Sequence, residues 1–121
     1  VYWLKVYEIP VASRASKGRP LVNMLNLDDD ETVTQILPVD EFADDKYIFM
    51  ATRNGTVKKT SLNMFAKKYK SGIKAINLDD NDKLVGSLVT DGNQEMLLAS
   101  NSGKLIRFHE SKVRPMGRTA R

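Results

Sequence analysis

Cysteine is absent from the sequence, and histidine and tryptophan each occur only once. The lack of cysteine excludes a disulfide framework and a thiolate metal site, which suits a reducing compartment. No apolar run approaches the roughly 20 residues that a helix needs to cross a bilayer, and the longest run, residues 47–51, has the length of a strand. No signal peptide is recognisable. The sequence therefore indicates neither a disulfide-rich secreted domain nor a membrane protein.

A catalytic constellation is also lacking. His109 has no cysteine nucleophile to activate, and it lies where a strand is expected to end. Both features favour an exposed or edge histidine over a general base. The serines lack a G-x-S-x-G elbow, and neither a P-loop nor a dinucleotide-binding glycine pattern occurs. The acidic runs 28–31 and 79–82 lack the glycine and the distal glutamate of a calcium loop, so we interpret them as solvated turns. The sequence predicts no catalytic residue, no metal ligand and no cofactor.

What the sequence does contain is charge arranged in bands. The net charge of +4 and the pI of about 9.4 only weakly indicate a polyanionic binding partner. However, residues 28–46 hold eight acids and one base, and residues 47–78 hold seven bases and no acid. Residues 79–95 are again acidic, and both ends of the chain, residues 1–27 and 96–121, are basic. Because an ordinary surface mixes its signs, the banding predicts one basic and one acidic region, with two acidic loops on an ordinary surface as the alternative.

The chain also contains a repeat of about fifty residues. Residues 47–59 match residues 95–107 at an offset of 48, and each copy reads as an apolar strand, a turn ending in glycine, and a second strand that carries bases. In the first copy the turn is Asn54-Gly55, a strong hairpin signal that predicts a type I′ turn, because both residues tolerate a positive φ.

A second pair of matching segments, 25–33 and 76–84, reads as strand, acidic turn and strand at an offset of 51. Together the repeats predict two units of four short strands each, at residues 20–26, 32–39, 46–52 and 56–61 and again at 73–78, 83–90, 94–100 and 104–109. Four strands in 40–50 residues, repeated, are typical of an all-β propeller-like array. The apolar runs 47–51 and 96–99 favour strands that are covered on both faces.

The unit boundaries follow from this pattern. Residues 1–7 read as the last strand of a preceding unit, and a single helical turn is expected near residues 62–65. We therefore expect one excised fragment of such a domain, 1–121, since the chain starts inside a strand without an initiator methionine. Its expected parts are 1–19, the end of a preceding blade with its connecting loop; 20–66 and 67–113, one blade each; and 114–121, the start of the next connection.

Every connection between these units is basic and contains a glycine. We name them the first connection (residues 13–20), the second connection (66–74) and the third connection (114–121). Successive connections of a circular array lie along one rim, so their bases predict a stripe that binds the phosphate backbone of duplex DNA independently of sequence. The alternative is that the lysines merely solvate loops. With adjoining strand residues, the predicted DNA-binding residues are Arg14, Lys17, Arg19, Lys58, Lys59, Lys67, Lys68, Lys70, Lys74, Lys104, Arg107, Lys112, Arg114, Arg118 and Arg121.

Several stretches resemble the C-terminal domain of the bacterial gyrase A subunit, and the resemblance spans essentially all 121 residues. They are Tyr7-Glu8-Ile9-Pro10, Gly18-Arg19-Pro20-Leu21-Val22-Asn23-Met24-Leu25, Ile36-Leu37-Pro38-Val39, Phe49-Met50-Ala51-Thr52-Arg53-Asn54-Gly55-Thr56-Val57-Lys58-Lys59-Thr60 and Arg107-Phe108-His109-Glu110-Ser111-Lys112-Val113-Arg114-Pro115-Met116-Gly117. The resemblance implies a six-bladed β-pinwheel with strands exchanged between blades, of which about two blades are present, as an incomplete array. It also implies that DNA wraps around the basic perimeter and that the domain supports ATP-dependent negative supercoiling in the bacterial cytoplasm, at the nucleoid. The implied partners are duplex DNA, the gyrase B subunit, and the rest of the gyrase A subunit.

The chain departs from the family in two respects. The Gly-Arg-rich box of the first blade is absent, and the first connection, with Arg14, Lys17, Gly18 and Arg19, is its looser counterpart. The cleavage tyrosine of the N-terminal region is absent too, so the resemblance implies a non-catalytic part of a type II topoisomerase.

A propeller that binds an acidic protein and the equivalent domain of the topoisomerase IV A subunit remain alternatives. Open strand edges also predict self-association.

Overall fold

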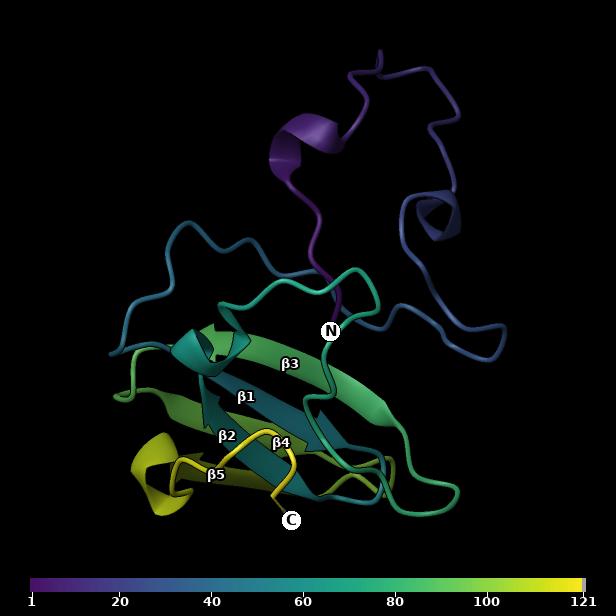
Figure 1. Ribbon diagram of the computed structural model, residues 1–121. Coiled ribbons are helices and arrows are strands. Elements are labelled where there is room, and N and C mark those ends of the chain that lie inside the picture. Colours follow the sequence, from purple (N-terminus) through teal and green to yellow (C-terminus); the bar gives the residue numbers. More distant parts are fainter. Residues whose placement is uncertain (121) are drawn as a thin grey trace.

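The computed structural model describes residues 1–120, and its regular structure consists of β-strands joined by loops and single 3-10 turns (Figure 1). This confirms the all-β prediction. The strands are β1 (Tyr47–Thr52), β2 (Val57–Ser61), β3 (Leu84–Thr90), β4 (Glu95–Ala99) and β5 (Leu105–His109). The 3-10 turns are η1 (Val6–Glu8), η2 (Leu21–Asn23), η3 (Leu62–Phe65) and η4 (Glu110–Lys112). Within the described residues no helix has the length and apolar character required to cross a membrane.

The first sheet combines strands from both sequence repeats. Its order is β2-β1-β3, all antiparallel, so that Phe49 in β1 lies opposite Lys59 on one side and Leu88 on the other. Strands β1 and β2 belong to the predicted blade 20–66, whereas β3 belongs to the predicted blade 67–113. The second sheet is the hairpin of β4 and β5. A strand of one repeat therefore completes the sheet of the other.

Both hairpins use the same turn. In the first, the Gly55 N–H donates to the Thr52 carbonyl (3.0 Å) and the Thr52 N–H donates to the Thr56 carbonyl (2.9 Å). The equivalent bonds join Ser100 with Gly103 (3.1 Å) and with Lys104 (2.8 Å), at the predicted offset of 48. The predicted type I′ turn is wrong, because that turn needs two successive positive φ angles and here only the glycine has one. A three-residue loop with glycine in the left-handed position fits these bonds.

Strand β1 is buried on both faces. Ile48 and Met50 pack with Leu62 and Phe65 on one face, while Phe49 points to the opposite face, where its ring centroid lies 6.2 Å from that of Phe108. The prediction from the apolar run 47–51 is therefore confirmed. The matching run in β4 is covered on one face only.

In β4 the side chain of Leu97 is 61% exposed, whereas that of Met96 is buried. The repeat predicted burial of both, but no second sheet lies over the Leu97 face in the described part of the chain. The exposed face of the β4–β5 hairpin also carries Leu105, which is 62% exposed.

Four predicted strands are wrong for the described structure: residues 1–7, 20–26, 32–39 and 73–78 form no ladder. A strand needs a partner strand for its backbone N–H and C=O groups, and these segments have almost no backbone partner in another segment, although residues 20–24 bond within the turn of η2. The exception is a single pair of bonds between Val1 and Ile73, of 2.7 and 2.8 Å. The stretch that carries η1 and η2 instead projects away from the two sheets (Figure 1), whereas Trp3 and Val39 pack against the core.

Gly72, in the second connection, lies close against the ring of Tyr2 in the N-terminal segment. Its φ is +75°, and a Cβ atom there would lie 2.9 Å from the ring of Tyr2. Gly103 has a similar φ of +78° but open space around it. Both Gly→Ala changes should cost roughly 1–2 kcal/mol for the left-handed backbone, and Gly72→Ala should cost more because of the overlap with Tyr2.

Urea unfolding of the two variants measures this difference. The double variant Tyr2→Ala/Gly72→Ala should lose the additional cost, because the ring that the new methyl group meets has been removed. Equal destabilisation by Gly72→Ala and Gly103→Ala would show that the Tyr2 contact contributes nothing.

Candidate nucleic-acid interface

The second connection is a solvent-exposed loop with buried ends. Phe65, which ends η3, is fully buried, and Ile73 is 6% exposed. Between them the chain turns where the Gly72 N–H donates to the Tyr69 carbonyl (3.0 Å). Because both ends are anchored in the core, the lysines between them are held at the surface. Lys67 and Lys70 are exposed, and so is Lys74, which directly follows the second anchor.

Lys68 differs from the other lysines of this loop. It is exposed, but its ammonium group lies 5.4 Å from the ring centroid of Phe42 and 5.9 Å from that of Trp3. The two rings meet edge to face at 4.9 Å. Lys68 therefore joins the loop to the segment before β1 through cation–π contacts.

The third connection follows the outer edge of β2. After η4 the Met116 N–H donates to the Lys59 carbonyl (2.8 Å), and Pro115 forms a parallel bridge with the same residue. This places Arg114, which is exposed, and Arg118, which is half-buried, beside the first sheet. Lys112 is exposed at the end of η4.

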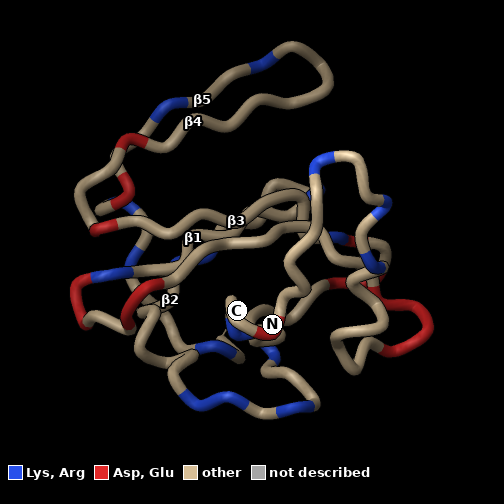
Figure 2. The backbone as a smooth tube through the Cα atoms, turned by 90° about the horizontal axis from the view of Figure 1, so that it is seen from above, with Lys and Arg blue, Asp and Glu red and all other residues tan. Residues whose placement is uncertain are grey.

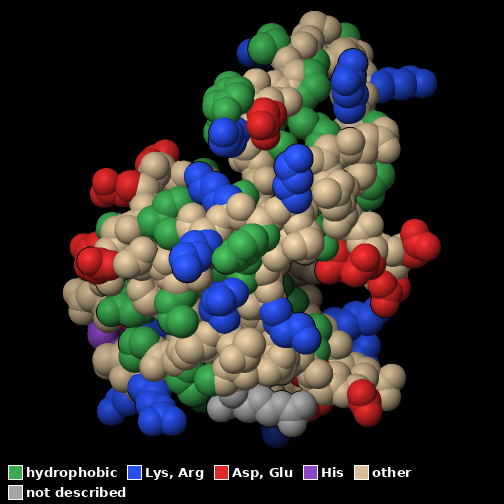
Figure 3. All heavy atoms as spheres, in the orientation of Figure 1, with side chains coloured by type: hydrophobic (Ala, Val, Ile, Leu, Met, Phe, Trp, Pro, Cys, Tyr) green, Lys and Arg blue, Asp and Glu red, His purple; other side chains and the backbone are tan. Residues whose placement is uncertain are grey.

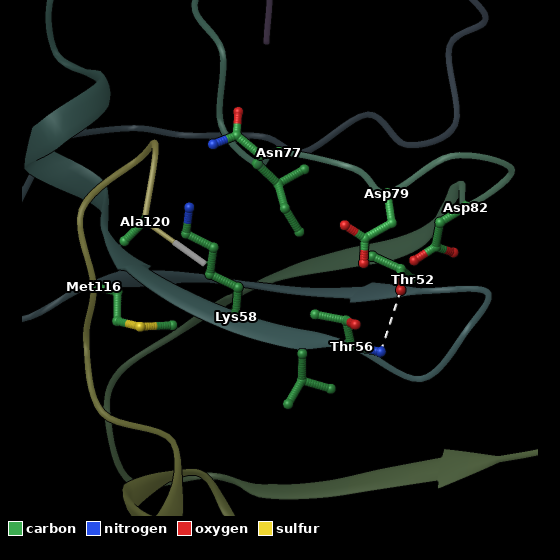
Figure 4. Close-up of a pocket in the computed structure, with 10 residues that line it drawn as sticks. Thr52, Thr56, Lys58, Asn77, Asp79, Asp82, Met116 and Ala120 are labelled. Carbon is green, nitrogen blue, oxygen red and sulfur yellow. Dashed lines mark hydrogen bonds between the residues drawn. The ribbon is translucent and has the colours of Figure 1, made fainter.

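Lys58 lies where the second and third connections meet, and its side chain is directed between them (Figure 4). It is only 2% exposed. Its ammonium group donates to the Ala75 carbonyl (3.1 Å) and to the Arg118 carbonyl. Burial lowers the pKa of this ammonium group. A further bond, from the Asn77 amide to the Thr119 carbonyl (2.7 Å), joins the same two segments.

Lys59 points to the opposite face of β2 and is 4% exposed. Its ammonium group donates to the Glu110 carbonyl (2.9 Å) and lies 3.7 Å from the Glu110 carboxylate. That carboxylate is fully buried and also accepts bonds from the Thr90 hydroxyl (2.8 Å) and the Gln94 N–H (2.9 Å). The network links β2 of the first sheet with Glu110 at the start of η4, which precedes the third connection.

The structure contradicts the surface placement predicted for Lys58 and Lys59. The two residues alternate across a strand whose faces are both covered, so each ammonium group lies inside the protein and is already hydrogen-bonded. The remaining strand bases do lie at the surface: Lys104 is exposed in the second hairpin turn, and Arg107 pairs with Glu95 at 3.0 Å.

The first connection lies apart from the other two. Arg14, Lys17 and Arg19 are exposed on the segment that projects from the sheets. The turn there is closed by the Ser16 N–H donating to the Ser13 carbonyl (3.1 Å). Arg121, the last predicted DNA-binding residue, lies outside the described residues.

Basic and acidic residues occupy separate stretches of the backbone (Figure 2). On the face shown in Figure 3, lysine and arginine side chains run down the middle and acidic side chains flank them on both sides. The acidic run 28–31 is tied to the N-terminus by Tyr2, whose hydroxyl donates to the Glu31 carboxylate. That bond raises the pKa of Tyr2 to about 12 and lowers the pKa of Glu31.

The second acidic run is only partly a solvated turn. Asp82 is buried and accepts hydrogen bonds from the Asn54 N–H (3.0 Å) and the Lys83 N–H (2.8 Å). A hydrogen bond from the Thr52 side chain is the main cause that lowers the pKa of Asp82, and the two backbone bonds lower it further. Asp82 thus holds the first hairpin turn. No cluster of three or more histidine or carboxylate side chains suited to a metal ion occurs among residues 1–120.

Sequence reasoning missed Glu110 and Asn77. Glu110 is the only acid among residues 96–121, so its isolation in a basic band was a usable signal. Asn77 offered no such signal in the sequence, because its contact with Thr119 depends on where the third connection lies in the folded chain.

A sequence profile of the family described as "DNA gyrase C-terminal domain, beta-propeller" matches residues 1–40, 46–91 and 94–121. The chain belongs to this family. The DNA gyrase A subunit of Aeromonas salmonicida is 55% identical over 116 residues, and that of Escherichia coli (strain K12) is 51% identical over 117 residues. These alignments cover 96% and 97% of this chain but 13% of each relative, so the chain spans about an eighth of their length.

Two solved structures share the fold. The C-terminal domain of DNA topoisomerase IV has a TM-score of 0.77 at 34% identity, covering 85% of this chain and 32% of that chain. A DNA gyrase A C-terminal domain has a TM-score of 0.76 at 24% identity, covering 98% and 37%. The resemblance to the gyrase A family and the propeller-like fold class are therefore confirmed, and coverage of about a third of each solved chain agrees with an incomplete array.

The contact between Lys59 and Glu110 should contribute strongly to the stability of this gyrase-family domain. Lys59→Met should lower the free energy of unfolding by about 3–5 kcal/mol, because it leaves a buried carboxylate without its cation. Arg107→Met, which breaks a pair whose side chains are 71% and 49% exposed, should cost no more than about 1 kcal/mol.

Chemical denaturation of both variants tests the difference. Lys59→Met/Glu110→Gln should recover part of the loss, since a neutral amide costs less to bury than a carboxylate. Similar losses from Lys59→Met and Arg107→Met would contradict the buried network.

Proposed function

We propose that the chain binds duplex DNA through its phosphate backbone, without sequence preference, as a DNA-wrapping part of a type II topoisomerase. The observation that carries the proposal is the meeting of the second and third connections at Lys58. Their exposed bases, among them Lys70, Lys74 and Arg114, belong to neighbouring surface segments. A polyanion with regularly spaced charges can contact such bases together and release its counterions.

The proposed role in the whole enzyme follows from the relatives. As a part of the DNA gyrase A subunit, the chain would support ATP-dependent negative supercoiling together with the gyrase B subunit, in the bacterial cytoplasm at the nucleoid. The rest of the gyrase A subunit would take part in the same assembly, and the chain would act without catalytic residues of its own. The equivalent role in topoisomerase IV is the second candidate, favoured by the similarity to its C-terminal domain.

A charge-matched comparison tests the DNA-binding proposal. Lys70→Gln/Lys74→Gln should weaken binding equally for duplexes of unrelated sequence and reduce the slope of log K against log salt by about 0.9 for each lost phosphate contact. Lys46→Gln/Lys83→Gln removes the same charge next to the acidic runs and should change binding little, because carboxylates already repel the backbone there.

Titration of labelled duplex at several salt concentrations gives both quantities. If four to six phosphates are contacted, the unmodified chain should show a slope of roughly −4 to −5. Equal losses from the two double variants would mean that only net charge matters. A slope near zero, or binding restricted to an acidic protein, would reject the proposal in favour of a protein-interaction propeller.

We also propose that the chain self-associates through the β4–β5 hairpin. Leu97 and Leu105 are exposed on one face, and the edge of β4 away from β5 pairs with no strand among residues 1–120. Unpaired strand edges and apolar faces favour association. Leu97→Glu should reduce the weight-average mass in sedimentation at high concentration, whereas Val11→Glu, at a fully exposed position on the N-terminal segment, should not. A monomer at every concentration would contradict the prediction.

A further inference from the structure

The second and third connections come from different repeats, yet one side chain joins the end of the second connection to the third. Lys58 donates to the carbonyl of Ala75, just beyond the second connection, and to the carbonyl of Arg118 in the third. A lysine ammonium group has three donors and no acceptor, so it can bond carbonyl groups from two segments at once. The contact therefore joins two backbones that share no ladder in the described structure.

The strand itself does not require a lysine at this position. The residue that corresponds to Lys58 in the second repeat, at the offset of 48, is Ile106, which is 57% exposed in β5. The two hairpins nevertheless share the same turn bonds. The lysine is therefore a feature of the junction between the connections and not of the repeated hairpin.

Other contacts at the junction act on the same segment. Asn77 bonds the Thr119 carbonyl at 2.7 Å, and the Met116 N–H bonds the Lys59 carbonyl at 2.8 Å. Figure 4 shows Lys58 between the segment that carries Met116 and Ala120 and the segment that carries Asn77. Of these contacts, only that of Lys58 is made by a buried charged group.

We propose that Lys58 is a positioning residue, whose buried ammonium group fixes the spacing between the second and third connections so that their exposed bases meet one duplex in register. The proposal rests on the proposed DNA-binding function. It replaces the direct phosphate contact that the sequence predicts for Lys58, because a side chain that is 2% exposed and bonded to two carbonyl groups does not reach a ligand at the surface.

The first measurement needs no DNA. Because the chain has no cysteine, the exposed residues of a Ser71→Cys/Thr119→Cys variant can carry two spin labels that report the distance between the connections. The unmodified background should give a single narrow distance distribution. Adding Lys58→Met keeps most of the apolar stem of the side chain but removes the ammonium group and its donors, and the distribution should broaden.

The second measurement is a double-mutant cycle with Lys74→Gln in a labelled-duplex titration. Lys58→Met should weaken binding roughly two- to thirtyfold, the range produced by changes that act through an intermediate element. The combined loss should be smaller than the product of the single losses, because Lys74 contributes less once the connections are no longer held. An unchanged distance distribution, with multiplicative losses and a salt slope reduced by about 0.9, would overturn the proposal and indicate a direct contact.

A related variant keeps the proposal testable if Lys58→Met does not fold. Asn77→Ala removes the bond to Thr119 from a half-buried side chain and should broaden the same distance distribution to a smaller extent. No broadening would overturn the proposal. If the unmodified chain binds no duplex, the proposed function fails, while the distance distributions still decide whether Lys58 fixes the spacing.

Discussion

The burial of both faces of β2 is the constraint on which the placement of the two neighbouring connections depends. Successive side chains on a strand point to opposite faces, so the ammonium groups of Lys58 and Lys59 are buried on opposite sides of the sheet. Each must bond polar groups there, because an unsatisfied buried ammonium group is very costly. Lys58 bonds the carbonyl groups of Ala75, just beyond the second connection, and of Arg118 in the third, and Lys59 bonds Glu110. The polar requirements of one short strand thus bring the basic segments together.

Local signals in the sequence predicted the hairpins well. The glycine turns and the apolar runs before them place β1, β2, β4 and β5 within a residue of their observed bounds. The strands that failed, at residues 1–7, 20–26, 32–39 and 73–78, have suitable composition, but composition does not supply a partner. Strand formation there depends on pairing at long range, which a pattern along one chain does not reveal.

The surface placement of the basic residues could be predicted for the loops of the candidate interface but not for strand β2. Glycine and clustered lysines between apolar runs identify an exposed basic loop, as observed for Lys70 and Lys74. Two adjacent lysines on a strand, in contrast, suggest at least one exposed face. Only the packing of the third connection on one side and of Glu110 on the other shows that neither face of β2 is free. The turn type was predicted wrongly because Asn-Gly fits both a type I′ turn and the three-residue loop observed here.

The two repeats share backbone hydrogen bonds but differ in the side chains at equivalent positions. Turn bonds recur at an offset of 48, and so does the bond that closes each hairpin, from Leu62 to Lys46 and from Glu110 to Gln94, both of 2.9 Å. At these equivalent positions one repeat has leucine and the other has a buried glutamate. The shared backbone sets the path of each unit, while the side chains that differ decide how it meets its neighbour. A chimera of two identical repeats would therefore keep both hairpins and lose the contact between Lys59 and Glu110, because no unit carries both partners on its own.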